Sequence, residues 1–113
     1  MDGMYPKITP ELAKRRSELA PETYKAFQNF SRQVFAEGAL SEKFKQLIAI
    51  AVAHVTQCPY CIDEHTKLAK VKGATSEEVM EAIWVAADIR AGGAYSHSVL
   101  AIHALHEKPD TQG

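Results

Sequence analysis

Two cysteines and a histidine near the middle of the chain have the spacing of a redox centre. Cys58 and Cys61 are the only cysteines among 113 residues, and His65 follows four residues after the second. Pro59 favours a helix that begins between them. Cys58 then lies at the positive end of that helix, where thiolate is favoured over thiol. His65 lies one turn beyond Cys61 on the same face, where its imidazole can exchange a proton with the thiol.

This arrangement is suited to dithiol chemistry with an oxidant such as a hydroperoxide. One cysteine attacks the oxidant and becomes a sulfenic acid, and the other displaces water from it to leave a disulfide. An external thiol must then restore the pair. The helix terminus favours Cys58 as the more acidic thiol, whereas the offset of His65 favours Cys61. The structural alternative is two buried free cysteines that act as small hydrophobic side chains.

Cap and turn residues predict an all-α fold of about six helices. Helix starts are indicated by five signals: Thr9-Pro10, Pro21, Ser41, Pro59, and Thr75 or Ser76. Helix ends are predicted at Gly38, near Gln57 and at Gly73. The run "RAGGAYSH" predicts an interruption before a sixth helix or a kinked continuation. The small residues of "VAADIRAGGA" indicate close approach of another helix.

Apolar residues recur at helical spacing and predict the buried faces. The third helix has such a stripe at Phe44, Leu47, Ile48, Ala51, Val52 and Val55, and the fifth has Val79, Ile83, Trp84, Ala87 and Ile89. The chain is expected to be one domain over 1–113, with a core at about 20–105 and tails at 1–8 and 107–113. So small a core makes self-association natural.

The composition and net charge of the chain argue against two classes of binding partner. Hydrophobic residues are 46% and the net charge is −1, so no basic field is available for nucleic acid or an anionic membrane. The chain start lacks the pattern of a secretory signal, and the run "LIAIAVA" is too short to span a bilayer. We expect a soluble cytoplasmic protein without a cofactor.

The stretch from "KQLIAIAVAHVTQCPYCIDEH" to "AADIRAGGAYSH" resembles the carboxymuconolactone decarboxylase superfamily, and the cysteine motif resembles its AhpD-like alkylhydroperoxidase branch. The resemblance covers about residues 20–105. It implies an all-helical trimer or hexamer that reduces hydroperoxides, with a dihydrolipoyl-type or thioredoxin-like thiol as reductant. It also implies that Cys61 attacks peroxide, that Cys58 resolves the sulfenic acid and that His65 relays protons.

One position departs from the family pattern. The relay glutamate lies twelve residues before the first cysteine, and this chain has Gln46 there. A glutamine forms hydrogen bonds but cannot carry a proton at ordinary pH. We expect His54 to serve as a substitute base, because a histidine exchanges protons near neutral pH. Glu42, one turn before Gln46, is interpreted as a solvated residue of the first helical turn.

Three other functions compete. Cys58, Cys61, His65 and His54 could bind zinc, with His97, His103 and His106 as more distant candidates. A lactone decarboxylase would need a carboxylate-binding residue, for which Arg90 is the main candidate. The cysteine pair argues against this function. A non-enzymatic thiol sensor or oligomeric scaffold is the third.

Overall fold

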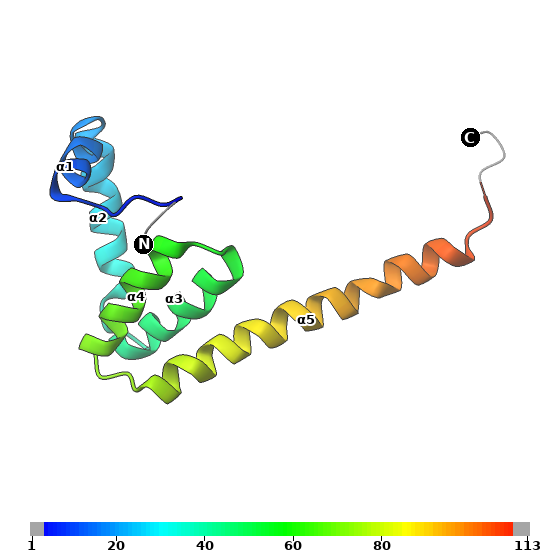
Figure 1. Cartoon of the computed structure of the whole chain (residues 1–113). Coiled ribbons are helices and arrows are strands. Elements are labelled where there is room, and N and C mark those ends of the chain that lie inside the picture. The colour runs from blue at the N-terminus through cyan, green and yellow to red at the C-terminus, as the bar shows by residue number, and fades with distance from the viewer. Residues whose placement is uncertain (1–3, 110–113) are drawn as a thin grey trace. The chain divides into compact units, whose positions relative to one another are not determined.

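The computed structural model describes residues 4–109, and helices are the only regular structure in that range (Figure 1). The five helices are α1 (Pro10–Glu18), α2 (Pro21–Phe35), α3 (Glu42–Thr56), α4 (Pro59–Val71) and α5 (Ser76–His106). The all-α fold class is therefore confirmed. The chain divides between Ala36 and Glu37 into two compact units, which are described in turn.

The first unit contains α1 and α2. Thr9 caps α1, because its hydroxyl accepts from the backbone N–H of Leu12 at 3.2 Å, and Pro10 occupies the first helical position. The prediction that Gly38 ends the second helix is wrong. The chain leaves α2 at Ala36 in an extended conformation, with φ −67° and ψ 150°. An exit of this kind requires no left-handed residue, so no glycine is needed there.

The second unit is built around α3, which packs against both α4 and α5. Ser41 caps α3 as predicted, with its hydroxyl 3.1 Å from the backbone N of Phe44. Two ion pairs tie the first turn of α3 to its neighbours. Glu42 pairs with Lys72 just after α4 at 2.7 Å, and Lys43 pairs with Glu78 on α5 at 2.9 Å.

The core of the second unit is small and made largely of alanine. Ile50 is fully buried, and the other buried apolar residues are Ala53, Ala69 and Ala86, so each of the three helices contributes. Small side chains let helix axes approach closely. The only other buried side chain in residues 4–109 is the amide of Gln46, which is 5% exposed.

The predicted apolar stripe of α3 is only partly covered by this chain. Phe44, Ile48, Val52 and Val55 are each about half exposed, between 43% and 54%. The helix instead turns Gln46, Ile50 and Ala53 inward, at spacings of four and three residues. The sequence periodicity therefore predicted an apolar face of α3 correctly, but it did not predict which face of α3 is buried within this chain.

Helix α5 is continuous over 31 residues, so the predicted interruption at "RAGGAYSH" is wrong. Gly92 and Gly93 cost about 1 kcal/mol each relative to alanine, and the good helix formers around them outweigh this. The helix begins with a capping box in which Thr75 and Glu78 exchange side-chain and backbone hydrogen bonds of 3.1 and 2.9 Å.

The second half of α5 has almost no cover from the described chain. Every residue from Ala87 to His106 except Gly93 is exposed, and α5 extends well past the α3–α4 pair (Figure 1). Ala86, in the run that predicted close helix approach, is buried, but a Cβ atom at Gly92 or Gly93 would meet nothing within 4 Å. Among the described residues the close approach is therefore made at Ala86 and not at the two glycines. None of the helices in residues 4–109 is long and apolar enough to cross a membrane.

The predicted tails carry no helix where they are described, at 4–8 and 107–109. The rest of each tail lies outside the described residues. That residues 1–113 form one domain stays a prediction.

Candidate active site

The cysteine pair is positioned by a sharp turn between α3 and α4. Gln57 ends α3 in the left-handed conformation, with φ 57° and ψ 53°. The backbone N–H of Cys58 then bonds back to the carbonyl of Ala53 at 3.1 Å, which closes a Schellman-type end. Pro59 occupies the first turn of α4, as predicted. The turn therefore brings Cys58 to the N-terminus of a new helix immediately after the old one ends.

Cys58 and Cys61 are joined in a disulfide within the first turn of α4, with their Cα atoms 5.2 Å apart. Cys58 is the N-cap residue, and its sulfur lies 3.2 Å from the backbone N–H of Cys61, which donates to it. Both cysteines are partly exposed. A sulfur at a helix N-terminus that receives a backbone N–H is stabilised as thiolate after reduction. The predicted placement of Cys58 is confirmed.

His65 lies one turn beyond Cys61 on α4, and its ring reaches across to α3. Its Nδ1 is 2.7 Å from Oε1 of the buried Gln46, 19 residues earlier in the chain. An amide oxygen only accepts hydrogen bonds, so the ring nitrogen must donate. The structure thus joins two of the predicted site residues, His65 and Gln46, by a hydrogen bond that no local sequence pattern indicates.

The other candidate bases, His54 and Glu42, have partners of their own outside the cysteine pair. His54 donates from Nδ1 to the carbonyl of Ile50 in its own helix at 2.7 Å. Glu42 lies in the first turn of α3 as interpreted, but it is only partly exposed and pairs with Lys72 rather than with solvent alone. That His54 acts as a base for the cysteines stays a prediction.

Metal binding gains no support from the arrangement of side chains. Within residues 4–109, no group of three or more histidine, cysteine or acidic residues is placed to hold a metal ion. His97 donates to the carbonyl of Gly93, and His103 lies 3.1 Å from the carboxylate of Glu107, both within α5. The zinc alternative would therefore require a rearrangement around the reduced cysteines.

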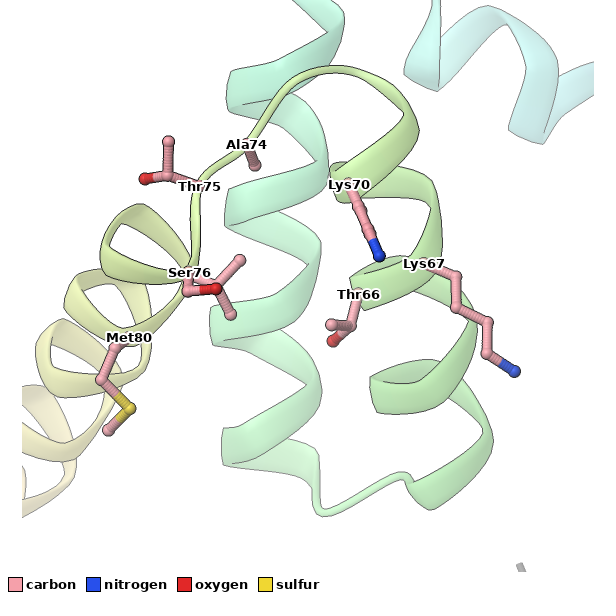
Figure 2. Close-up of a pocket in the computed structure, with 8 residues that line it drawn as sticks. Thr66, Lys67, Lys70, Ala74, Thr75, Ser76 and Met80 are labelled. Carbon is pink, nitrogen blue, oxygen red and sulfur yellow. The ribbon is translucent and has the colours of Figure 1, made fainter.

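A cavity of about 460 Å³ lies between α4 and the start of α5 (Figure 2). Figure 2 shows Thr66, Lys67 and Lys70 on one side, from α4, and Ser76 and Met80 on the other. None of the site residues Cys58, Cys61 and His65 lines this cavity. Arg90, the residue considered for carboxylate binding, is exposed on α5 and does not line it either.

A sequence model of the carboxymuconolactone decarboxylase family matches residues 21–104, which is most of the chain. The chain belongs to this family. The matched range begins with α2 and ends near the end of α5, so it includes the cysteine pair and His65.

Relatives and solved structures agree with this membership. "Uncharacterized protein 4 in cox locus" of Paracoccus denitrificans is 60% identical over 82 residues, which are 73% of this chain and 74% of the relative. A crystal structure from Methanobacterium thermoautotrophicum has a TM-score of 0.71 and 38% identity, covering 74% of this chain and 94% of that one. A carboxymuconolactone decarboxylase family protein of Legionella pneumophila, crystallised in its apo form, has a TM-score of 0.66 and 35% identity over 83% of each chain.

Proposed function

We propose that this member of the carboxymuconolactone decarboxylase family is a thiol-dependent peroxidase of the AhpD-like branch. The observation that carries the proposal is the Cys58–Cys61 disulfide inside the first turn of α4. Both cysteine residues are partly exposed, and the imidazole of His65 lies one turn further along the same helix. Reactive cysteines occur in such surroundings, whereas inert structural cysteines are buried.

In this function Cys61 attacks the hydroperoxide and Cys58 resolves the sulfenic acid. Cys61 is the cysteine one turn from His65, which can accept its proton. Cys58 is three residues away on the same turn, and the two cysteines are joined there in a disulfide. An external dithiol of the dihydrolipoyl or thioredoxin type then reduces the disulfide. The cytoplasm maintains such donors.

The same proposal includes assembly into a homo-trimer or homo-hexamer. Large apolar side chains are exposed along the second half of α5, and among them are Ile89, Val99, Leu100 and Leu105, each at least 65% exposed. Monomeric soluble proteins rarely expose contiguous apolar surface on this scale. A neighbouring copy would cover this face.

The test is the intact mass of the reduced protein after one equivalent of cumene hydroperoxide, followed over time. The proposal predicts a rapid loss of two hydrogen atoms together with release of cumyl alcohol. Reduced Cys58→Ser/Cys61→Ser protein, treated identically, is the control for uncatalysed loss of peroxide. A wild-type protein that keeps both thiols while peroxide remains would refute peroxidase function.

A further inference from the structure

The unusual glutamine of the site lies against the histidine that the proposed reaction uses. Gln46 is 5% exposed, and its Oε1 is 2.7 Å from Nδ1 of His65. A neutral imidazole carries one proton, on Nδ1 or on Nε2. Because the amide oxygen accepts only, this contact requires the proton on Nδ1. Because Gln46 requires the proton on Nδ1, the Nε2 atom of the neutral ring is left without one and can accept a proton.

We infer that Gln46 is a positioning residue that fixes His65 with a proton on Nδ1, so that Nε2 alone exchanges protons with the reacting groups. This inference rests on the proposed peroxidase function. It also explains how a chain without the family's glutamate can carry out the reaction, because no proton needs to pass beyond the imidazole.

In the first step of the proposed reaction, a single ring nitrogen of His65 is enough for both proton transfers. The S–H bond of Cys61 breaks and its proton goes to Nε2, while the sulfur attacks the terminal oxygen of the hydroperoxide. An S–O bond forms and the O–O bond breaks. The departing alkoxide takes the proton back from Nε2 and leaves as an alcohol. Cys61 has become a sulfenic acid, oxidised by two electrons, and the peroxide has been reduced by the same two.

The second step repeats the same exchange. Nε2 takes the proton of Cys58, whose sulfur attacks the sulfur of Cys61. The S–S bond forms, the S–O bond breaks, and the departing hydroxide leaves as water with the proton from Nε2. His65 ends each step with the protons it began with. The Nδ1–H bond to Gln46 persists in both charge states, since a protonated imidazole also donates from Nδ1.

Charged groups near this contact have partners of their own. At the first turn of α3, one turn before Gln46, Glu42 pairs with Lys72 after α4 and Lys43 pairs with Glu78 from α5. On α4, Asp63 pairs with Lys67, and on α3 the ring of His54 bonds to its own helix. The direct partner of the Nδ1 atom is therefore an uncharged amide, which holds the ring without the attraction that a carboxylate would exert on an imidazolium.

The experiment uses full-length reduced protein with ¹⁵N-labelled histidine. Ring ¹⁵N shifts report which nitrogen of His65 carries the proton, with His65→Asn used to assign its signals. We expect the Nδ1–H form in the wild type and a shift toward Nε2–H in Gln46→Met, which keeps the side-chain length but removes the acceptor. Gln46→Glu should keep the Nδ1–H form, because a carboxylate also accepts from Nδ1, and it adds a negative charge beside the ring. Circular dichroism checks that each variant is folded.

A second measurement tests the effect on Cys61. It follows the rate at which iodoacetamide alkylates Cys61 as a function of pH, in Cys58→Ser protein and without any peroxide. Gln46→Met should slow alkylation at neutral pH about tenfold, the lower end of the loss found when a metal-binding imidazole loses the partner that orients it. Gln46→Glu should retain the reaction but displace its pH profile. An Nε2–H ring in the wild type, or an unchanged Gln46→Met profile, overturns the inference. An Nδ1–H ring with the expected profiles but no peroxide-driven disulfide would reject the peroxidase function alone.

Discussion

Lys43 and Glu78 connect α3 to α5 through an ion pair of 2.9 Å, and the same carboxylate caps α5. The Lys43 hydrogen bond is the main reason that the pKa of Glu78 lies below its ordinary value of 4.5, and the backbone N–H of Thr75 adds to it. The Glu78 side chain thus stabilises the first turn of α5 and also links that turn to α3.

The stability that Glu78 provides should disappear in acid. Its pKa is lower in the folded than in the unfolded chain, so its contribution is complete above about pH 4.5 and is lost as pH falls through the folded value. Urea unfolding at fixed protein concentration measures this. Glu78→Gln should lower the midpoint at pH 7 and approach the wild type at pH 3. Asp63→Asn, which breaks the exposed pair with Lys67, should change little. A Glu78→Gln deficit that is the same at both pH values would contradict the assignment.

Replacing either cysteine alone should impair the reaction with hydroperoxide, but at a different step for each. Cys58→Ser leaves the attacking thiol without its resolving partner, so we expect a gain of one oxygen atom, trapped by dimedone, on Cys61. Cys61→Ser should react with hydroperoxide about a hundredfold more slowly, because the thiol one turn from His65 is gone and Cys58 lies a further turn away from that base. Stopped-flow mixing followed by mass spectrometry checks both. Sulfenic acid on Cys58 in the Cys61→Ser protein, formed at the wild-type rate, would reverse the roles.

The two histidines near the cysteines should differ in importance. His65→Ala removes the imidazole one turn from Cys61 and should slow peroxide-driven disulfide formation by about 10²-fold or more. His54→Ala removes a ring that donates to the carbonyl of Ile50, and we expect less than about a threefold change. This outcome would reject the sequence-based prediction that His54 is the substitute base. Equal losses in the two variants would restore it.

The exposed face of α5 should be covered in solution by other copies of the chain. Light scattering after size exclusion is expected to give the mass of a trimer or hexamer. Leu100→Asp, at a position that is 66% exposed in the single chain, should shift it toward monomer. Ser96→Asp adds the same charge on the same helix without removing an apolar side chain and serves as the control. A monomeric wild type at micromolar concentration would exclude the assembly.

Local chemistry made much of the fold predictable from sequence. Thr9, Ser41, Pro59 and Gly73 mark helix boundaries through caps, fixed dihedrals and a positive φ, and each acts within a few residues of itself. The placement of Cys58 at the start of α4 followed from the same signals. The break expected at Gly92 was wrong because glycine weakens a helix by an amount that its flanking sequence can outweigh.

What the sequence did not reveal depends on contacts between helices. The hydrogen bond of Gln46 to His65 joins positions 19 apart, and neither residue type indicates it alone. The face of α3 that is buried is likewise determined by packing, since Ile50 and Ala53 turn inward while Val52 and Val55 stay half exposed. Periodicity locates an apolar surface, but it does not say whether the same chain or another covers it.

The proposed assembly would make the packing of the uncovered half of α5 depend on protein concentration. An isolated helix of about a dozen residues is only marginally stable in water, because tertiary packing supplies most helical stability. From Ala87 to His106 this chain offers itself almost no such packing. In the proposed assembly, the packing of that segment would depend on the concentration of chains, whereas the turn that holds Cys58 and Cys61 is formed within one chain.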